Sequence, residues 1–444
     1  MAFCFSECDF VCLMHLKTPK KRLFLCQTNE YVLFMALNYI WIAFVLIAFV
    51  VALVQMIFFG NTAIFNDILQ SIFGSAKSGF EISLGLTGIL TFWMGILKIA
   101  ENGGAMTVVS RIVAPFFSRI YPEIPKNHPA LSSIFLNMSA NMLGLDNAAT
   151  PMGLQAMKQM QELNPKKDTA SNPMIMFLVL NTAGLVLVPM TVMMYRAQFG
   201  AVNPADVFLP IVVATLCAWL SGLILVSIIQ KINLFNRVVM GVLISLVGFI
   251  VGLVYFFSRL SQEQITAYSS FAAAFIILSI IVVFVIMAVR KKINVYSTFI
   301  DGAKEGFQVA VGIIPYLVSI LVAIGMFRAS GAMDLVVDGI RYLVAATGTN
   351  TDFVEDLPTA FMKPLSGSGA RGMMVETMKE FGTDSFVGRL SSIIQGSTDT
   401  TFYILAVYFG SVKITNTRYA VIAGLAADII GILAAILLGY LFFH

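Results

Sequence analysis

The most polar string inside an apolar stretch of this chain is Gln395-Gly-Ser-Thr-Asp-Thr-Thr401, in the middle of the apolar run over residues 385–411. A carboxylate at the centre of a lipid bilayer costs about 2.5 to 3.5 kcal/mol on insertion scales, so Asp399 needs a partner. A milder counterpart, Asn181-Thr-Ala-Gly184, lies in the middle of the run over residues 173–196. Both patterns predict broken helices whose freed backbone groups face a solute or an ion.

Two further segments, residues 130–160 and 357–382, are too polar and glycine-rich to face lipid, yet too apolar for ordinary loops. They are typical of re-entrant helical hairpins, whose tips point inward because only protein or a watery cavity can satisfy their backbone. Helix N-termini at such tips attract anionic or polar atoms. The candidate substrate-binding residues are therefore Asn137, Ser139, Asn141, Asp146, Asn147, Thr150, Asn181, Thr182, Ser366, Gly367, Ser368, Gly369, Arg371, Gln395, Ser397, Thr398, Asp399 and Thr400.

Two charged residues in these regions have alternative interpretations. Arg371 would suit a carboxylate or phosphate of a solute, and it would equally pair with Asp399 or Asp146. Asp428, in the last apolar run, is a cation or proton-relay candidate, or a group that hydrogen-bonds between helices. Asp399 and Asp428 are thus the ion-coupling candidates, with Na⁺ and H⁺ both open.

Other motifs give no sign of an enzyme. The string Gly367-Ser-Gly-Ala-Arg-Gly372 matches GxGxxG, but a dinucleotide site also requires a preceding strand in a βαβ unit. Walker A, HExxH and Ser-His-Asp patterns are absent, and the cysteines have no recurring metal-ligand spacing. We therefore expect no enzymatic activity, no metal, no cofactor and no nucleic-acid partner.

Composition identifies an integral membrane protein. Of 444 residues, 58% are hydrophobic and only 12% are charged, which leaves too little polar surface for a soluble globule. Two short amphipathic segments, residues 104–120 and 332–347, are predicted to lie at the membrane interface. Nine runs of near-membrane length predict an all-α polytopic protein; they cover residues 36–58, 81–100, 173–196, 205–230, 238–257, 266–289, 307–327, 385–411 and 418–442.

A block of the sequence repeats at an offset of about 227 residues. Ala76-Lys-Ser-Gly-Phe80 returns as Ala303-Lys-Glu-Gly-Phe307, and Gly104-Ala-Met106 returns as Gly331-Ala-Met333. Lysine and arginine in short loops concentrate on the cytoplasmic side. With a cytoplasmic N-terminus, the basic first hairpin segment lies inside and the acidic second one outside. The two halves therefore form an inverted repeat.

Four segments follow from this pattern. Residues 36–232 form the first repeat, residues 233–295 a linking transmembrane pair and residues 296–444 the second repeat. Residues 1–34 are a doubtful extension, because Met35-Ala-Leu-Asn38 reads like an ordinary translation start. A mis-called start or disordered tail is our interpretation of this segment, and a lipidated or metal-binding tail is the alternative.

The order of these elements resembles that of the concentrative nucleoside transporters, and the sequence is similar to the nucleoside-recognition Gate domain shared with the membrane part of ferrous iron transport protein B. The first half, with Asn137-Met-Ser-Ala-Asn141 and the string from Leu143 to Pro151, resembles the spore maturation protein A family. The second half, with the strings from Lys363 to Gly372 and from Gln395 to Thr401, resembles the spore maturation protein B family. The resemblance implies a fusion of the two, located in a bacterial inner membrane and connected to spore-core dehydration or an equivalent role.

Two functional interpretations follow. The first is a secondary transporter of a small polar or anionic solute, nucleoside-like or a carboxylate, with a site made by two hairpin tips and two broken helices. The second is a membrane scaffold or envelope-assembly factor that keeps the fold and moves nothing. The expected partners are a small-molecule solute and the lipid bilayer, and the sequence is also compatible with a homo-oligomer.

Overall fold

The computed structural model describes residues 19–444, with side chains described for residues 38–145 and 149–444. Of the predicted extension over residues 1–34, residues 1–18 lie outside the described residues, and residues 19–34 lie outside the described side chains. The described part is helical, and its one β-bridge joins Thr169 to Asn416. Seven helices in this part are long and apolar enough to cross a membrane. The prediction of an all-α polytopic membrane protein is therefore confirmed.

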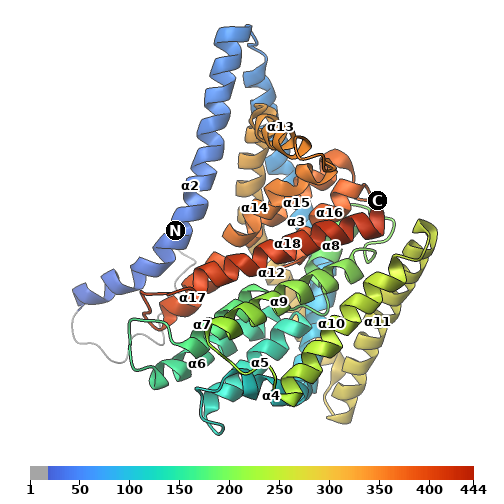
Figure 1. The fold of residues 1–444 in the computed structure, drawn as a ribbon. Helices are drawn as coiled ribbons and strands as arrows, with labels where there is room; N and C mark the ends of the chain where they lie inside the picture. Colours follow the sequence, from blue (N-terminus) through green and yellow to red (C-terminus); the bar gives the residue numbers. More distant parts are fainter. Residues whose placement is uncertain (1–18) are drawn as a thin grey trace.

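The helices follow the predicted order (Figure 1). Each of the two predicted broken helices consists of two short helices, and each predicted hairpin consists of two helices with a short tip. The helices are α2 (Pro19–Phe59), α3 (Ile64–Gly103), α4 (Ala105–Ile120), α5 (Pro129–Leu143), α6 (Asp146–Leu163), α7 (Asn172–Thr182), α8 (Met190–Gln198), α9 (Phe208–Ile229), α10 (Arg237–Phe257), α11 (Gln262–Arg290), α12 (Val295–Ala329), α13 (Ala332–Ala345), α14 (Leu357–Leu365), α15 (Gly367–Phe381), α16 (Phe386–Gly396), α17 (Thr401–Ser411) and α18 (Ala420–Phe443), with a 3₁₀ turn at Asp352–Asp356.

The long helices α3 and α12 pack against each other in antiparallel fashion. The repeat explains which residues make their contacts. A Cβ added to Gly79 would lie 3.0 Å from the backbone of Val318, and one added to Gly306 would lie 2.9 Å from the Cα of Thr91. Gly79 and Gly306 hold the same place in the repeat, and so do Thr91 and Val318. The same glycine contact is therefore made twice, once from each copy, as two copies running in opposite directions require.

The ends of α3 and α12 also repeat. Gly104, with a φ of 85°, ends α3 and begins the amphipathic helix α4, and Gly331, with a φ of 74°, stands between α12 and α13 in the same way. Glycine takes this left-handed conformation without steric cost. Figure 1 shows α4 and α13 at opposite ends of the molecule, which agrees with the inverted repeat.

Both long helices begin earlier than the apolar runs predict. The prediction placed the spans at residues 81–100 and 307–327, whereas the helices begin at Ile64 and Val295. Charged residues lower the hydropathy there but do not interrupt the helices, because they pair at helical spacing. Lys77 lies 3.7 Å from Glu81, and Lys304 lies 3.8 Å from Asp301.

The linking pair, α10 and α11, lies at the edge of the molecule in Figure 1. Its large apolar side chains point outward, as Phe249 on α10 and Phe271 on α11 show with exposed fractions of 50% and 70%. Such faces suit lipid tails, because apolar surface costs nothing in the bilayer. The interior that positions the site is built by the other helices.

Candidate functional site

The two broken helices cross at their breaks. The backbone N–H of Asp399, between α16 and α17, donates to the carbonyl of Thr182, at the end of α7, over 2.8 Å. Gly184 follows with a φ of 55°, and a Cβ at this glycine would lie 3.0 Å from the same backbone nitrogen. We call residues 182–184 and 397–400 the crossing. Backbone groups that helical hydrogen bonding leaves free are thus partly satisfied by each other.

Ion pairs and loops fix the outer ends of the broken helices. The guanidinium of Arg196, at the end of α8, lies 3.0 Å from Asp206 and 2.9 Å from Asp384, just before α16. At the opposite ends, the backbone N–H groups of Thr415 and Asn416 donate to the carbonyl of Asp168 over 2.9 and 3.0 Å. The broken helices are therefore joined at both ends as well as at the crossing.

Each hairpin tip lies against one break. In the first, the N–H of Leu187 donates to the carbonyl of Met142 over 2.9 Å. In the second, a Cβ at Gly367 would lie 2.8 Å from the hydroxyl of Thr400, and the hydroxyl of Ser366 caps α15 by accepting from the N–H of Gly369 over 3.0 Å. Small residues at the tips therefore let the backbone approach the breaks closely.

A cavity of about 850 Å³ lies beside the crossing. We call it the amide cavity, because Asn141 of the first hairpin and Asn181 of α7 contribute facing side chains to it. It lies between the first hairpin, the end of α7, the break between α16 and α17, α17 itself and α12. Its lining comprises Asn141, Ala149, Thr150, Pro151, Asn181, Glu305, Gln308, Val309, Asp399, Tyr403, Ile404, Val407 and Tyr408.

Hydrogen bonds orient the polar groups of the amide cavity. The side-chain amide of Asn141 donates to the side-chain oxygen of Asn181 over 2.7 Å, and that of Asn181 donates to the carbonyl of Phe177 over 2.8 Å. The N–H of Thr400 donates to the Asp399 carboxylate over 2.7 Å. Asp399 is an exposed residue and lines the cavity.

Four of the predicted site residues line the amide cavity: Asn141, Thr150, Asn181 and Asp399. Four others lie near it but bond to protein. Asn137 donates to the carbonyl of Ala149 over 2.8 Å, and the hydroxyls of Ser139, Thr182 and Ser397 donate back to carbonyls of their own helices. Their positions are those of packing groups that support the site.

The remaining predicted residues are distributed around the crossing. The side chains of Asp146 and Asn147 lie outside those the structure describes. Ser366, Gly367, Ser368 and Gly369 form the second hairpin tip against Thr400 and are absent from the lining of the amide cavity. Gln395 and Thr398 are buried at the end of α16 and in the break, each with an exposed fraction of 5%.

Asp428 lies on α18 directly behind the break of the second broken helix. It is 1% exposed, and one carboxylate oxygen accepts from the hydroxyl of Thr401 over 2.6 Å. A glycine on each side of it in the helix, Gly424 and Gly431, lets Thr401 and Thr398 approach α18. Both interpretations of Asp428, a helix-packing hydrogen bond and an ion-coupling group, are compatible with this position.

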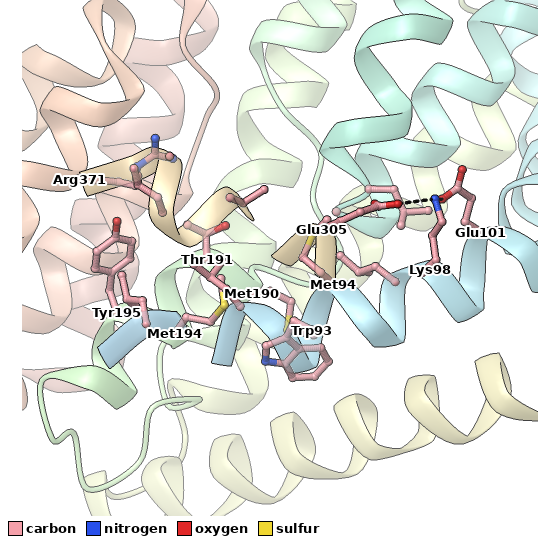
Figure 2. A pocket seen from close by; sticks show the side chains of 18 of the residues that line it. Trp93, Met94, Lys98, Glu101, Met190, Thr191, Met194, Tyr195, Glu305 and Arg371 are labelled. Carbon is pink, nitrogen blue, oxygen red and sulfur yellow. Dashed lines mark ion pairs between the residues drawn. The ribbon is translucent and has the colours of Figure 1, made fainter. Parts of the chain in front are cut away.

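Arg371 faces a different space from the other candidates. It lines a second cavity of about 370 Å³, which we call the arginine cavity, between α3, α12, α8 and the first turns of α15 (Figure 2). No ion pair joins Arg371 to Asp399 among the described side chains, and the side chain of Asp146, the other predicted partner, lies outside them. Glu305 and Val309 of α12 line both cavities, which are therefore neighbours on one wall.

Sequence reasoning did not identify four polar residues of the amide cavity, Glu305, Gln308, Tyr403 and Tyr408. A signal for Glu305 was present. The repeated block reads Ala-Lys-Ser-Gly-Phe in the first copy and Ala-Lys-Glu-Gly-Phe in the second, so the copies differ at the one position where α12 carries a carboxylate into the cavity wall.

The fold and the crossing define a polytopic membrane protein built from two inverted copies of one unit, and sequence comparisons agree with this class. The family model described as nucleoside recognition, Gate, matches residues 83–199 and 310–415, half of the chain. Each matched segment contains one amphipathic helix, one hairpin and one broken helix. The chain therefore belongs to the nucleoside-recognition Gate family.

Two relatives of this chain are different spore maturation proteins. The chain is 38% identical over 188 residues to spore maturation protein A of Bacillus subtilis (strain 168), which covers 42% of this chain and 92% of that protein. It is 46% identical over 153 residues to spore maturation protein B of the same organism, which covers 34% of this chain and 84% of that protein. One chain thus combines sequence similar to two separate proteins. No solved structure matches it.

Proposed function

We propose that this protein is a secondary transporter that moves a small polar solute through the amide cavity. The observation that carries the proposal is the crossing of two broken helices, one from each inverted copy, beside a cavity of about 850 Å³. Non-helical backbone is tolerated at membrane depth only where protein or a water-filled space satisfies it. Sites of this construction, at the interface of inverted repeats, are typical of secondary transporters.

The lining favours a neutral solute rich in hydrogen-bond donors and acceptors. Asn141 and Asn181 offer amides, and Tyr403 and Tyr408 offer aromatic surface with hydroxyl groups. Asp399 and Glu305 bring two carboxylates into the same wall, which would repel a dicarboxylate. A nucleoside-like solute satisfies these groups better than an anion, in keeping with the name of the family.

Ion coupling completes the proposal. Asp399 and Asp428 are the candidate coupling groups, because each is a carboxylate beside the break of α16 and α17. A bound Na⁺ or H⁺ would offset the cost of these charges. We place the protein in a bacterial inner membrane with a cytoplasmic N-terminus, and we expect no enzymatic activity.

The experiment measures uptake of radiolabelled uridine, adenosine, succinate and glutamate into proteoliposomes, with and without Na⁺ and a pH gradient. Asp399→Asn should reduce uptake of the transported solute to background while thermal stability is retained. Asp67→Asn, which changes an exposed carboxylate at the start of α3, is the matched control and should transport normally.

A membrane scaffold is the competing function. In that case no solute in the panel would be taken up or would stabilise the purified protein, although ligand binding raises thermal stability in proportion to RT ln(1 + [L]/Kd). Uptake that is equal in the Asp399→Asn and wild-type proteins would remove the crossing from the mechanism.

A further inference from the structure

The arginine cavity carries an inference beyond the proposed transport site. Its two ends differ in charge (Figure 2). Arg371 and Tyr195 lie at one end, and Lys98, Glu101 and Glu305 lie at the other. The space between them has a volume within the range of small-molecule sites, about 300 to 1,000 Å³.

Arg371 differs from the other arginines of the interior. Arg196 contacts Asp206 and Asp384, Arg389 contacts Asp206, and Arg328 contacts Glu380. By contrast, no ion pair or hydrogen bond joins Arg371 to any of the side chains described at residues 38–145 and 149–444, although its own side chain is only partly exposed. A partly buried charge inside a membrane protein is costly without a counter-charge. A guanidinium presents planar paired donors, which match a carboxylate or a phosphate.

The middle of the cavity is apolar and adaptable. Trp93 and Met94 of α3 line it together with Met190 and Met194 of α8 (Figure 2). Methionine side chains fill irregular gaps and make favourable contacts with aromatic rings. This lining suits a hydrocarbon or aromatic body, and it offers little to a sugar or a peptide backbone.

The far end disfavours a second negative charge. The ammonium of Lys98 lies 3.1 Å from Glu305 and 3.3 Å from Glu101. One ammonium and two carboxylates leave this end with a net charge of −1. A ligand with an anion at each end would therefore meet repulsion here.

We propose that the arginine cavity binds a small organic monoanion with an apolar body, its carboxylate or phosphate on Arg371 and its body against Trp93 and the methionines. Either a free solute or the head of an anionic lipid has this chemistry. The site depends on Arg371 and not on Asp399, so it can be tested separately from transport through the amide cavity.

The test uses the full chain in nanodiscs of phosphatidylcholine with three probes of similar length: 4-phenylbutyrate, 4-phenylbutylamine and suberate. Thermal stabilisation and the emission of Trp93 report binding. Phenylbutyrate should bind the wild type, and both the amine and the dianion should bind at least about tenfold more weakly. The emission change should disappear in Trp93→Phe.

Variants locate the site. Arg371→Gln should weaken phenylbutyrate binding at least about tenfold, and Arg371→Lys should recover part of it. Arg111→Gln removes an exposed arginine of α4 outside the cavity lining, and it should bind like the wild type, as should Asp399→Asn. Equal binding of phenylbutyrate and the amine, or wild-type affinity in a folded Arg371→Gln protein, would overturn the proposal.

Nanodiscs that contain phosphatidylglycerol distinguish the two sources. Competition between this lipid and phenylbutyrate, lost in Arg371→Gln, would support the site with a lipid headgroup as its ligand. If phosphatidylglycerol leaves phenylbutyrate binding unchanged, this would support the site with a free solute as its ligand.

Discussion

The N–H of Asp399 donates to the carbonyl of Thr182 over 2.8 Å and joins the two inverted copies of this fold at the point where both helices are broken. Each residue lies in the polar string of its own copy. Because the bond pairs backbone groups that no helix satisfies, it makes the two breaks one structural unit. The same unit forms one wall of the amide cavity.

Gly184→Ala tests how tightly the crossing is packed. Gly184 has a φ of 55°, and an added Cβ would lie 3.0 Å from the nitrogen and 3.1 Å from the Cβ of Asp399. Backbone strain and overlap together should lower the free energy of unfolding by about 1 to 3 kcal/mol, measured by denaturant titration in detergent.

Gly248→Ala is the control for this substitution. Gly248 lies within α10, and a Cβ there would meet nothing within 4 Å. Replacement of a helical glycine by alanine should be neutral or stabilise by up to about 1 kcal/mol. Equal effects at both positions would show that the breaks do not pack as described.

The hydrogen bond from Asn141 to Asn181 couples the first hairpin to the first broken helix. A double-mutant cycle with Asn141→Ala and Asn181→Ala should give a coupling energy of about 0.5 to 1.5 kcal/mol in unfolding titrations. A parallel cycle of Asn141→Ala with Ser245→Ala should be additive, because Ser245 bonds within α10. Additivity in the first cycle would argue against the 2.7 Å bond.

Much of the fold could be predicted from the sequence, because membrane spans and their breaks depend on local composition. The apolar runs at 173–196 and 385–411 contain their polar strings, and each is a broken helix in the structure. The amphipathic segments predicted over residues 104–120 and 332–347 are likewise the helices α4 and α13. These features require no knowledge of tertiary packing.

Which residues line the site depends on how the helices pack, and no local pattern in the sequence gives this information. The predicted span began at residue 307, so Glu305 fell in a loop, although α12 is already helical there and carries it into both cavities. Arg371 follows the second polar tip directly, yet α15 turns its side chain toward α3 and α8. A residue that lies next to a polar string in the sequence therefore does not have to belong to the same site as that string.

Arg196→Met should be the most destabilising of the charge substitutions. Arg196 is fully buried and contacts both Asp206 and Asp384, so its loss leaves Arg389 as the one cation beside these two carboxylates, at a cost of about 3 to 5 kcal/mol. Arg389→Met should cost less, because Arg389 is partly exposed and Asp206 keeps Arg196. Thermal unfolding in detergent ranks the variants, and a milder effect for Arg196→Met than for Arg389→Met would contradict this ranking.

Asp356, in the 3₁₀ turn before the second hairpin, should make stability depend on pH. Burial and the neighbouring Glu355 raise the pKa of its carboxyl well above the usual value, against an opposing contribution from the Ser391 hydroxyl. Because the unfolded chain has a pKa of about 3.9 here, the stabilising contribution is complete below about pH 4 and is lost as pH rises through the raised pKa.

Asp356→Asn cannot titrate, so its free energy of unfolding should rise relative to wild type by up to about 1.4 kcal/mol per pH unit across this window. Titrations between pH 4 and 8 measure the difference. A pH-independent gap between Asp356→Asn and wild type would show that this carboxyl is ionised in the folded state.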